Sequence, residues 1–289
     1  MERNGAMIEL SEVSKRIGAF ELRKCNIKIP GGYICGIAGP NGAGKTTLLH
    51  LLLGLYRPDS GNVQIDGRGY DREEKQIHDR IGTVLVEDLF DPALSVWENG
   101  RCYGKYFSQY DAAVFEHDLV QFEVDGKKRF EKLSKGEKLK AQFAFALSHA
   151  PELLILDEPA SNFDPEFREQ FFAILQEFIS DGRKSVILTT HLTEDLDRYA
   201  DYLLYLSQGE MVYAGDMEQF REAYRVVSGE RYRITGCGKK RIIALEENTY
   251  GAKALMRHSA EDCYDEALTV SYPTVQEFMY FYEKRGMGL

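Results

Sequence analysis

The sequence has no long apolar segment. Its longest hydrophobic run, LLHLLLGLY at 48–56, is well short of the ~20 residues that a membrane-spanning helix needs. The opening MERNGAMIELSEV has no apolar region after its basic residue, so we expect no secretory signal. If the protein works at a membrane, another chain is expected to supply the span.

Basic charge and cysteine are also scarce. There are 36 Lys and Arg against 46 Asp and Glu, a net charge of −10. Because domains that bind nucleic acid usually carry a basic face, we expect no nucleic-acid partner. The cysteines form no Cys-x-x-Cys pair and lie mostly among apolar residues, which indicates a reduced, cytosolic chain. They are Cys25, Cys35, Cys102, Cys237 and Cys263.

A phosphate-binding loop is the strongest motif present. GPNGAGKTT at 39–47 fits the pattern G-x-x-x-x-G-K-[ST] and lies between a buried strand predicted at 32–38 and a helix predicted at 46–56. Glycines let backbone N–H groups wrap around phosphates, and the helix N-terminus adds positive charge. We expect Lys45 to reach the β- and γ-phosphates and Thr46 to bind Mg²⁺. The predicted nucleotide-binding residues of the loop are Gly39, Pro40, Asn41, Gly42, Ala43, Gly44, Lys45, Thr46 and Thr47.

Two acidic residues end a second predicted strand. In ELLILDEPA at 152–160, four apolar residues lead into Asp157 and Glu158. Open α/β sheets bind ligands at this end of their strands, so we expect Asp157 to hold Mg²⁺ and Glu158 to polarise the attacking water. The strand SVILTT at 185–190 ends in His191, which is predicted to reach the same γ-phosphate.

A helix is predicted between these two strands. Asp164 is placed as its N-cap and Pro165 as its first residue. Its predicted apolar stripe is Phe167, Phe171, Ile174 and Phe178. Such a crossover helix joins parallel strands of one sheet, so the fold class is α/β.

The segment LSKGE at 133–137 predicts a second anion site. It precedes a helix with an apolar stripe at Phe143, Ala146 and Leu147. Ser134 and Gly136 are therefore expected at a helix N-terminus, with free N–H groups and a hydroxyl. Because the chain already has one phosphate loop, the spare site indicates a phosphate delivered by another subunit.

Taken in order, these motifs resemble the ATP-binding-cassette (ABC) ATPases over about residues 7–215. LSKGE is similar to the signature motif LSGGQ, SNFD at 161–164 to the D-loop, and Phe20 to the aromatic residue that stacks on adenine. The resemblance implies a P-loop cassette with a helical subdomain, with ATP and Mg²⁺ bound. It also implies that two cassettes, identical or closely related, pair head to tail, so that each signature helix contacts the γ-phosphate bound by the other.

The sequence departs from the family pattern at two motifs. Val86 stands where the Q-loop glutamine is usual, and valine cannot bind Mg²⁺; Glu87 is the predicted replacement if the loop shifts by one residue. In the signature, Lys135 replaces a glycine and Glu137 a glutamine. Since Lys45, Asp157 and Glu158 are kept, we expect ATP hydrolysis to survive.

Residues after 215 fall outside the cassette pattern. We predict a cassette domain at 1–215, with its helical subdomain at about 88–150, and a small α+β region at 216–289. Strands are expected at 224–229, 241–247 and 267–273, followed by a helix at 274–286. That helix is predicted to begin with a Thr274–Glu277 capping box and to bury Val275, Phe278, Met279 and Tyr282. The pattern P-T-x-x-[ED]-x-M-x-F at 273–281 resembles the tail of bacterial ABC-2-type exporter ATPases, including the YtrB-like and bacitracin-resistance groups.

Two functions fit this family. The first is the motor of an exporter, bound to a membrane permease at the inner face of the cell membrane; the second is a soluble cassette ATPase in a non-transport complex. Aromatic residues between 87 and 121 either receive the permease or form the core of the helical subdomain. They are Phe90, Trp97, Tyr103, Tyr106, Phe107 and Tyr110. The transported substrate is not encoded in these motifs.

Overall fold

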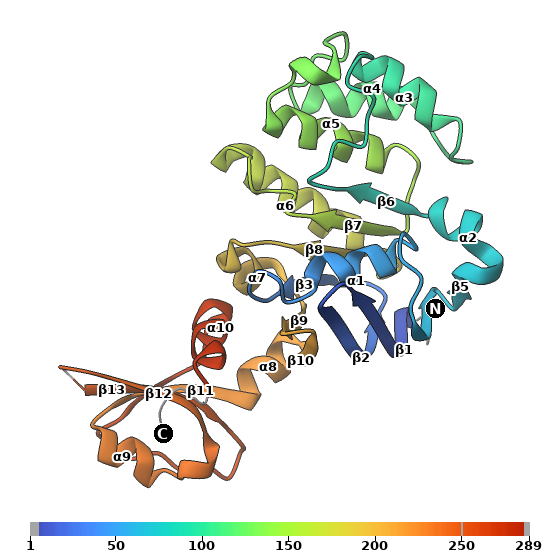
Figure 1. Ribbon diagram of the computed structural model, residues 1–289. Coiled ribbons are helices and arrows are strands. Elements are labelled where there is room, and N and C mark those ends of the chain that lie inside the picture. Colours follow the sequence, from blue (N-terminus) through green and yellow to red (C-terminus); the bar gives the residue numbers. More distant parts are fainter. Residues whose placement is uncertain (1–5, 250, 286–289) are drawn as a thin grey trace. The chain divides into compact units, whose positions relative to one another are not determined.

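The computed structural model of the protein describes residues 6–249 and 251–285 (Figure 1). The chain forms two compact units, Met1–His191 with Leu204–Val212, and Leu192–Leu203 with Tyr213–Leu289. Residues 1–5, which belong to the N-terminal segment where no secretory signal is expected, lie outside the described part. Among the described helices, none is long and apolar enough to cross a membrane.

The first unit begins with an antiparallel sheet of order β2-β1-β4-β5. Its strands are Ala6–Ile17 (β1), Phe20–Pro30 (β2), Ser60–Ile65 (β4) and Arg68–Gly69 (β5). Gly18, with φ of 58°, makes the turn between β1 and β2, a conformation that favours glycine. In β2, Cys25, Ile27 and Ile29 alternate with exposed polar residues, so this sheet has one buried face.

A second sheet, of order β10-β9-β3-β8-β7-β6, positions the phosphate-binding loop and the acidic residues. Its strands are Ile34–Ala38 (β3), Ile81–Val84 (β6), Leu153–Asp157 (β7), Ser185–Thr189 (β8), Tyr202–Ser207 (β9) and Glu210–Asp216 (β10). β3, β8, β7 and β6 run parallel. Strands β3 and β8 are buried along their whole length, and β7 up to its last residue, which explains their continuous apolar sequences.

Helix α1, Lys45–Leu52, follows the phosphate-binding loop and is shorter than the predicted 46–56. Gly54 has φ of 70°, and a Cβ there would lie 2.5 Å from the Tyr70 ring. A left-handed glycine just beyond a helix is a common helix stop. The prediction was wrong at this end because the apolar run continues through the turn.

The crossover helix α6, Pro165–Ile179, begins as predicted. The Phe167 N–H donates to the Asp164 carboxylate at 2.9 Å. The buried face is wider than the predicted stripe, because Phe172 and Leu175 are buried while Ile174 and Phe178 are only half-buried. The buried positions are thus Phe167, Phe171 and Leu175 at i, i+4 and i+8, with Phe172 beside this row.

Between β6 and β7 the chain forms α3 (Val96–Gly104), α4 (Ala112–Gln121), a short 3₁₀ helix (Phe130–Lys132) and α5 (Lys135–Leu147). These helices gather beyond β6, the edge strand of the parallel sheet (Figure 1). Between β5 and β6 lies α2, Tyr70–His78.

Aromatic rings form the core of this helical region. The Phe90 ring centroid lies 5.2 Å from that of Phe130 and 5.4 Å from that of Phe145. Of the six aromatic residues between 87 and 121 for which the sequence leaves two interpretations, Tyr106 is 67% exposed, Phe90 is buried, and the others are half-buried. The core interpretation therefore accounts for most of them. Residues 141–146 of helix α5 are all buried, including Phe143 and Ala146 of its predicted stripe, whereas the third predicted residue, Leu147, is only half-buried.

The second unit holds an antiparallel sheet of order β12-β13-β11-β14. Its strands are Tyr224–Gly229 (β11), Ile242–Asn248 (β12), Gly251–Arg257 (β13) and Thr269–Ser271 (β14). Its helices are α7 (Thr193–Tyr199), α8 (Met217–Ala223), α9 (Arg231–Gly236), a 3₁₀ helix (Lys239–Arg241) and α10 (Val275–Glu283). Val227, Ile234 and Met256 lie in its core. The sequence did not predict β13 or α9.

Helix α10 confirms the predicted capping box, because the Glu277 N–H donates to the Thr274 hydroxyl at 3.1 Å and the Glu277 carboxylate accepts from the Thr274 N–H at 3.1 Å. Its buried residues are Val275, Phe278 and Phe281. Met279 and Tyr282 are only half-buried, so part of the predicted stripe was wrong.

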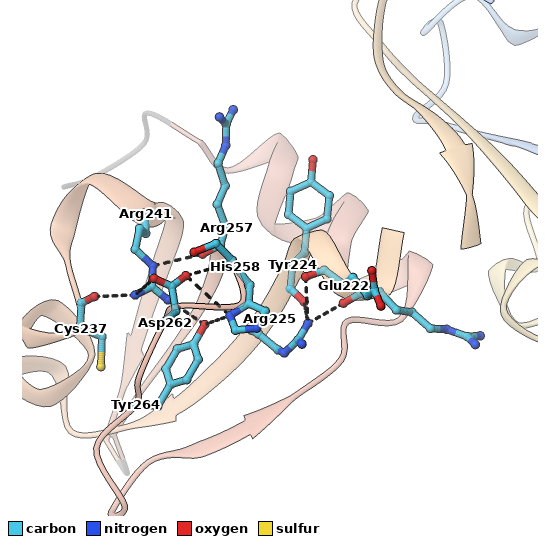
Figure 2. A network of polar contacts seen from close by, with 11 residues as sticks. Glu222, Tyr224, Arg225, Cys237, Arg241, Arg257, His258, Asp262 and Tyr264 are labelled. Carbon is cyan, nitrogen blue, oxygen red and sulfur yellow. Dashed lines mark hydrogen bonds and ion pairs between the residues drawn. The ribbon is translucent and has the colours of Figure 1, made fainter. Parts of the chain in front are cut away.

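A network of polar contacts fastens the connection between β13 and β14 (Figure 2). The Arg241 guanidinium donates to the Cys237 carbonyl oxygen at 3.0 Å and to the Tyr264 hydroxyl at 2.8 Å, and it pairs with Asp262 at 2.9 Å. His258 Nδ1 lies 3.1 Å from the same Tyr264 hydroxyl. Each of these groups has a partner inside the unit, so we regard the network as structural.

None of the five cysteines, all of which lie in the described part of the chain, forms a disulfide. Cys25 and Cys35 are buried in strands, as expected, and burial raises the pKa of Cys25 to about 12. Cys102 and Cys263 are exposed, so the expectation of packed thiols does not extend to them.

Candidate functional site: a nucleotide cavity

The phosphate-binding loop joins β3 to α1 and depends on glycine at two close approaches. A Cβ on Gly39 would lie 2.3 Å from the Leu206 carbonyl oxygen, and one on Gly44 would lie 2.7 Å from the Phe20 ring. Gly44 has φ of 111°, a left-handed value that other residues rarely adopt. The glycines therefore let the loop pack between β9 and β2.

The Lys45 ammonium lies inside this loop. Its Nζ donates to the carbonyl oxygens of Gly39 at 2.6 Å and Pro40 at 3.2 Å. Burial lowers the pKa of Lys45, an effect opposed by the Glu158 and Asp157 carboxylates. The Lys45 cation thus lies at the N-terminus of α1 and close to Asp157 and Glu158, where a bound phosphate would contact it.

The acidic residues at the end of β7 are fixed by a threonine of the neighbouring strand. The Thr189 hydroxyl donates to Asp157 Oδ1 at 2.5 Å and accepts from the Glu158 backbone N–H at 3.0 Å. Glu158 has φ of 48°, a left-handed conformation that is uncommon for such a residue. Residues held in this way cluster at functional sites, where the surrounding structure compensates for the strain. No motif of the sequence singles out Thr189.

His191 contacts Glu158 directly. Its ring Nε2 lies 3.1 Å from Glu158 Oε1, and its backbone N–H donates to Oε2 at 3.1 Å. Burial raises the pKa of Glu158 above its usual value, while His191 opposes that rise. The structure therefore brings together Asp157 and Glu158 at the end of β7, His191 just after the neighbouring strand β8, and Lys45 at the start of α1.

These residues line one cavity of about 550 Å³. The loop after β6 supplies another wall with Val86, which is 61% exposed, and Glu87. Ile17 and Phe20 from the first sheet close another side. The remaining lining residues are Asn41, Gly42, Ala43, Gly44, Lys45, Thr46, Thr47, Asp157, Glu158 and His191.

The donor set of this cavity fits Mg²⁺. The Thr46 hydroxyl and the Asp157 and Glu87 carboxylates all line it, and magnesium prefers hard oxygen ligands. These are the three residues predicted from the sequence. The Thr189 hydrogen bond to Asp157 orients one of these carboxylates, as expected for support around a metal ligand.

The LSKGE segment forms a capping box at the start of α5. The Glu137 N–H donates to Ser134 Oγ at 3.2 Å, and the Ser134 N–H donates to the Glu137 carboxylate at 2.7 Å. The expectation of a free Ser134 N–H was therefore wrong, because Glu137 uses it. Ser134 and Lys128 hold the pKa of Glu137 below its usual range. The backbone packs tightly here, since a Cβ on Gly136 would lie 2.7 Å from the Asn162 carbonyl oxygen.

A second, larger cavity of about 850 Å³ forms a groove beside the helical region. It runs between the end of α1, helix α2, strand β6 and the end of α3. Its apolar residues include Leu53, Leu55, Leu85, Leu89, Tyr106 and Phe107, and its charged residues Asp71, Arg72, Glu74 and Lys75. Leu55 and Tyr106 are among the exposed large apolar residues of the described chain.

Comparison with known proteins now places the chain in a family. A profile of the family described as ABC transporter matches residues 22–161. The chain is 33% identical over 216 residues to the Nod factor export ATP-binding protein I of Cupriavidus pinatubonensis (strain JMP 134 / LMG 1197), covering 73% of this chain and 66% of that protein. It is also 33% identical to the protein of the same name from Cupriavidus metallidurans (strain ATCC 43123 / DSM 2839 / NBRC 102507 / CH34), covering 73% of this chain and 71% of that one.

Solved structures agree with the fold. A dimeric bacterial ABC transporter cassette matches with a TM-score of 0.66 at 25% identity, covering 73% of this chain and 99% of that one. The ATP-binding subunit of an ABC transporter matches with a TM-score of 0.68 at 22% identity, covering 74% and 92%. These likenesses confirm the predicted P-loop α/β cassette.

The chain belongs to the ABC transporter family, as an ATP-binding subunit. It is an ATPase that uses ATP and Mg²⁺.

Proposed function

We propose that this protein is the motor subunit of an exporter, bound to its permease at the inner face of the cell membrane. The observation that carries the proposal is the nucleotide cavity, where a phosphate-binding lysine, two strand-end acids and a histidine meet. Export is favoured by the relatives named Nod factor export ATP-binding protein. In this reading residues 1–215 form the cassette and 216–289 an accessory region.

Within the cavity each residue has a proposed role. The loop 39–47 wraps around the phosphates of ATP, Lys45 neutralises the β- and γ-phosphates, and Phe20 stacks on the adenine. Thr46, Asp157 and Glu87 would hold Mg²⁺, which supplies charge neutralisation at the phosphates when bound.

Glu158 is the proposed general base for the attacking water. Its raised pKa brings it closer to neutral pH, which favours proton acceptance. His191, 3.1 Å from Glu158, keeps the carboxylate oriented and is placed to reach the γ-phosphate.

The signature segment is proposed to act on the nucleotide of the partner cassette. The N-terminus of α5 exposes Ser134, and the Ser134 hydroxyl, which accepts from the Glu137 N–H, keeps its own proton for donation. Gly136 adds a close backbone approach. Hydrolysis would therefore require two cassettes, and mixing inactive Ser134→Arg and Glu158→Gln chains tests this point. Restored activity at one site per dimer is expected, whereas none at any mixing ratio would show that the signature acts within its own chain.

The groove beside α2 is the proposed binding site for the permease. Apolar residues on its floor and charged residues along α2 suit a short amphipathic helix. Tyr106→Glu should abolish stimulation of ATP hydrolysis by the permease and leave the basal rate unchanged. Val120→Glu is the matched control, because Val120 is an exposed apolar residue of α4 that does not line the groove.

The alternative is a soluble cassette in a non-transport complex. To distinguish the two, we would purify the Glu158→Gln form with ATP from detergent-solubilised membranes of the source organism and identify what accompanies it. A stoichiometric multi-spanning protein supports the transporter. Soluble partners alone, with the chain absent from membranes, would support the alternative and leave the ATPase chemistry intact.

A further inference from the structure

One buried glutamine side chain holds the loop that follows β6. Gln142 lies in α5 and is 2% exposed. Its amide oxygen accepts from the Leu85 N–H at 3.1 Å, and its amide nitrogen donates to the Glu87 carbonyl oxygen at 3.4 Å. The two bonds bracket Val86, whose own side chain has no polar group.

The need for such a side chain follows from where β6 ends. The strand pairs with β7 only as far as Val84, which lies opposite Leu156. Leu85 is buried beyond this last pair, and a buried peptide N–H requires a hydrogen-bond partner. A glutamine amide has both an acceptor and donors, so a single side chain can satisfy the N–H and the carbonyl on either side of Val86.

The loop held in this way separates the two cavities. Leu85 and Leu89 line the apolar groove, whereas Val86 and Glu87, between them in sequence, line the nucleotide cavity. A displacement of this short segment therefore alters both cavities at once.

Helix α5 has a second attachment to the same loop. The Lys138 ammonium pairs with Asp88 at 2.7 Å. Lys138 and Gln142 are four residues apart and so lie on the same face of α5. That helix begins at the signature segment, so one rigid element joins Ser134 to the loop.

We infer that Gln142 is a positioning residue for the ATPase reaction. It fastens residues 85–88 to the signature helix and thereby sets the place of Glu87 in the nucleotide cavity. Gln142 acts on Glu87 through the backbone of residues 85–87, because the Val86 side chain between them cannot form a hydrogen bond. This inference rests on the proposed function, in which Glu87 binds Mg²⁺.

The first test measures the loop itself, by amide hydrogen exchange on the full chain. Gln142→Met keeps the length of the side chain and removes its hydrogen bonds. We expect the amides of residues 85–88 to exchange about five- to tenfold faster, the change expected from losing one hydrogen bond. The control is Gln176→Met, at an exposed position of α6. Unchanged exchange at 85–88 in a folded Gln142→Met protein would overturn the inference.

A second variant guards against a folding defect. Gln142→Glu keeps an acceptor for the Leu85 N–H at nearly the same volume. Exchange at Leu85 is expected to stay slow in this variant, and fast exchange in it would argue against the inferred bond.

The second test asks whether Gln142 acts through Glu87. Gln142→Met should raise the Mg²⁺ concentration needed for half-maximal ATP hydrolysis by roughly 10- to 100-fold, the range for residues that support a metal ligand. In a Glu87→Ala background the same change should have no further effect. Independent, multiplying effects would show that Gln142 does not position Glu87.

The two tests separate the inference from the proposed function. A wild-type chain that binds ATP but never hydrolyses it would contradict the proposed function, while the exchange measurement would still decide whether Gln142 holds the loop. An active wild type with multiplying effects would contradict the inference alone.

Discussion

The two walls of the nucleotide cavity are held in place by different means. On one wall, Asp157 and Glu158 continue from β7, and His191 follows β8 after one residue, so backbone ladders fix where these side chains begin. On the other wall, Val86 and Glu87 lie beyond the last pair of β6, and side chains of α5 fix them.

This difference gives the two walls different roles: the strand-end wall carries the groups that act on the phosphate, and the loop wall can change its position. Strand ends in the middle of a parallel sheet are rigid, which suits groups that must meet a phosphate with little tolerance. A loop held by one amide and one ion pair follows any displacement of the helix that carries them. We therefore expect substitutions on the strand-end wall to change the rate most, and substitutions on the loop wall to change Mg²⁺ dependence and coupling.

The largest effect is expected for the general base. Glu158→Gln should lower kcat for ATP hydrolysis by about 10²- to 10⁴-fold, because an amide cannot accept the proton of the attacking water. ATP binding should persist and the paired cassettes should accumulate, which size-exclusion chromatography would detect. Glu152→Gln is the control, since Glu152 precedes β7 at the opposite end and pairs with Arg80. Equal rates for wild type and Glu158→Gln would remove Glu158 from its proposed role.

Thr189→Val tests the support behind that wall. The change removes the hydroxyl that bonds both Asp157 and the Glu158 N–H, so kcat should fall by roughly 10- to 100-fold, as for other residues that orient metal ligands. Ser185→Ala is its match: the Ser185 hydroxyl accepts from the Gly32 N–H at 3.1 Å at the other end of β8. Comparable losses of activity in both variants would mean that Thr189 acts only through stability, which thermal unfolding measures separately.

The sequence predicted the strand-end wall because each strand carries its own signal. Continuous apolar runs identify β3, β7 and β8, and the polar residues that follow them meet at one edge of a parallel sheet. The G-x-x-x-x-G-K-T pattern then identifies the phosphate site, and the Asp164-Pro165 pair identifies the start of α6.

Other features depend on tertiary contacts that the sequence does not display. Gln142 interrupts an apolar helix, and only the end of β6 explains its burial. Thr189 is one of two threonines after an apolar run, and its role depends on the register of β7 against β8. Strand β13, GAKALMR, alternates too weakly to be recognised, and its pairing with β11 and β12 decides its structure.

The capping boxes offer a comparison with a smaller effect. Ser134 and Ser95 both accept from the N–H of a glutamate three residues later at 3.2 Å, so either Ser→Ala change should lower the free energy of unfolding by about 1 kcal/mol. Only Ser134 belongs to the signature segment. Ser134→Ala should therefore also reduce kcat, whereas Ser95→Ala should not, in chemical denaturation and steady-state assays run side by side. Equal kcat values in the two variants would show that Ser134 of LSKGE acts only as a helix cap.

The smallest expected effect is a shift of the pH profile. Glu158 must be ionised to accept a proton, so kcat falls as the pH drops through its pKa. Burial raises that pKa above the ordinary 4.5, which moves the acid limb of the profile upward, and the Lys45 and His191 charges oppose the rise. His191→Ala removes one opposing charge, so the limb should move further toward neutral pH. His117→Ala deletes an imidazole 3.1 Å from the Asp118 carboxylate, away from the cavity, and should leave the limb in place. A downward shift in His191→Ala would show that His191 does not favour the ionised form of Glu158, and of the two charges Lys45 alone would then oppose the effect of burial on that pKa.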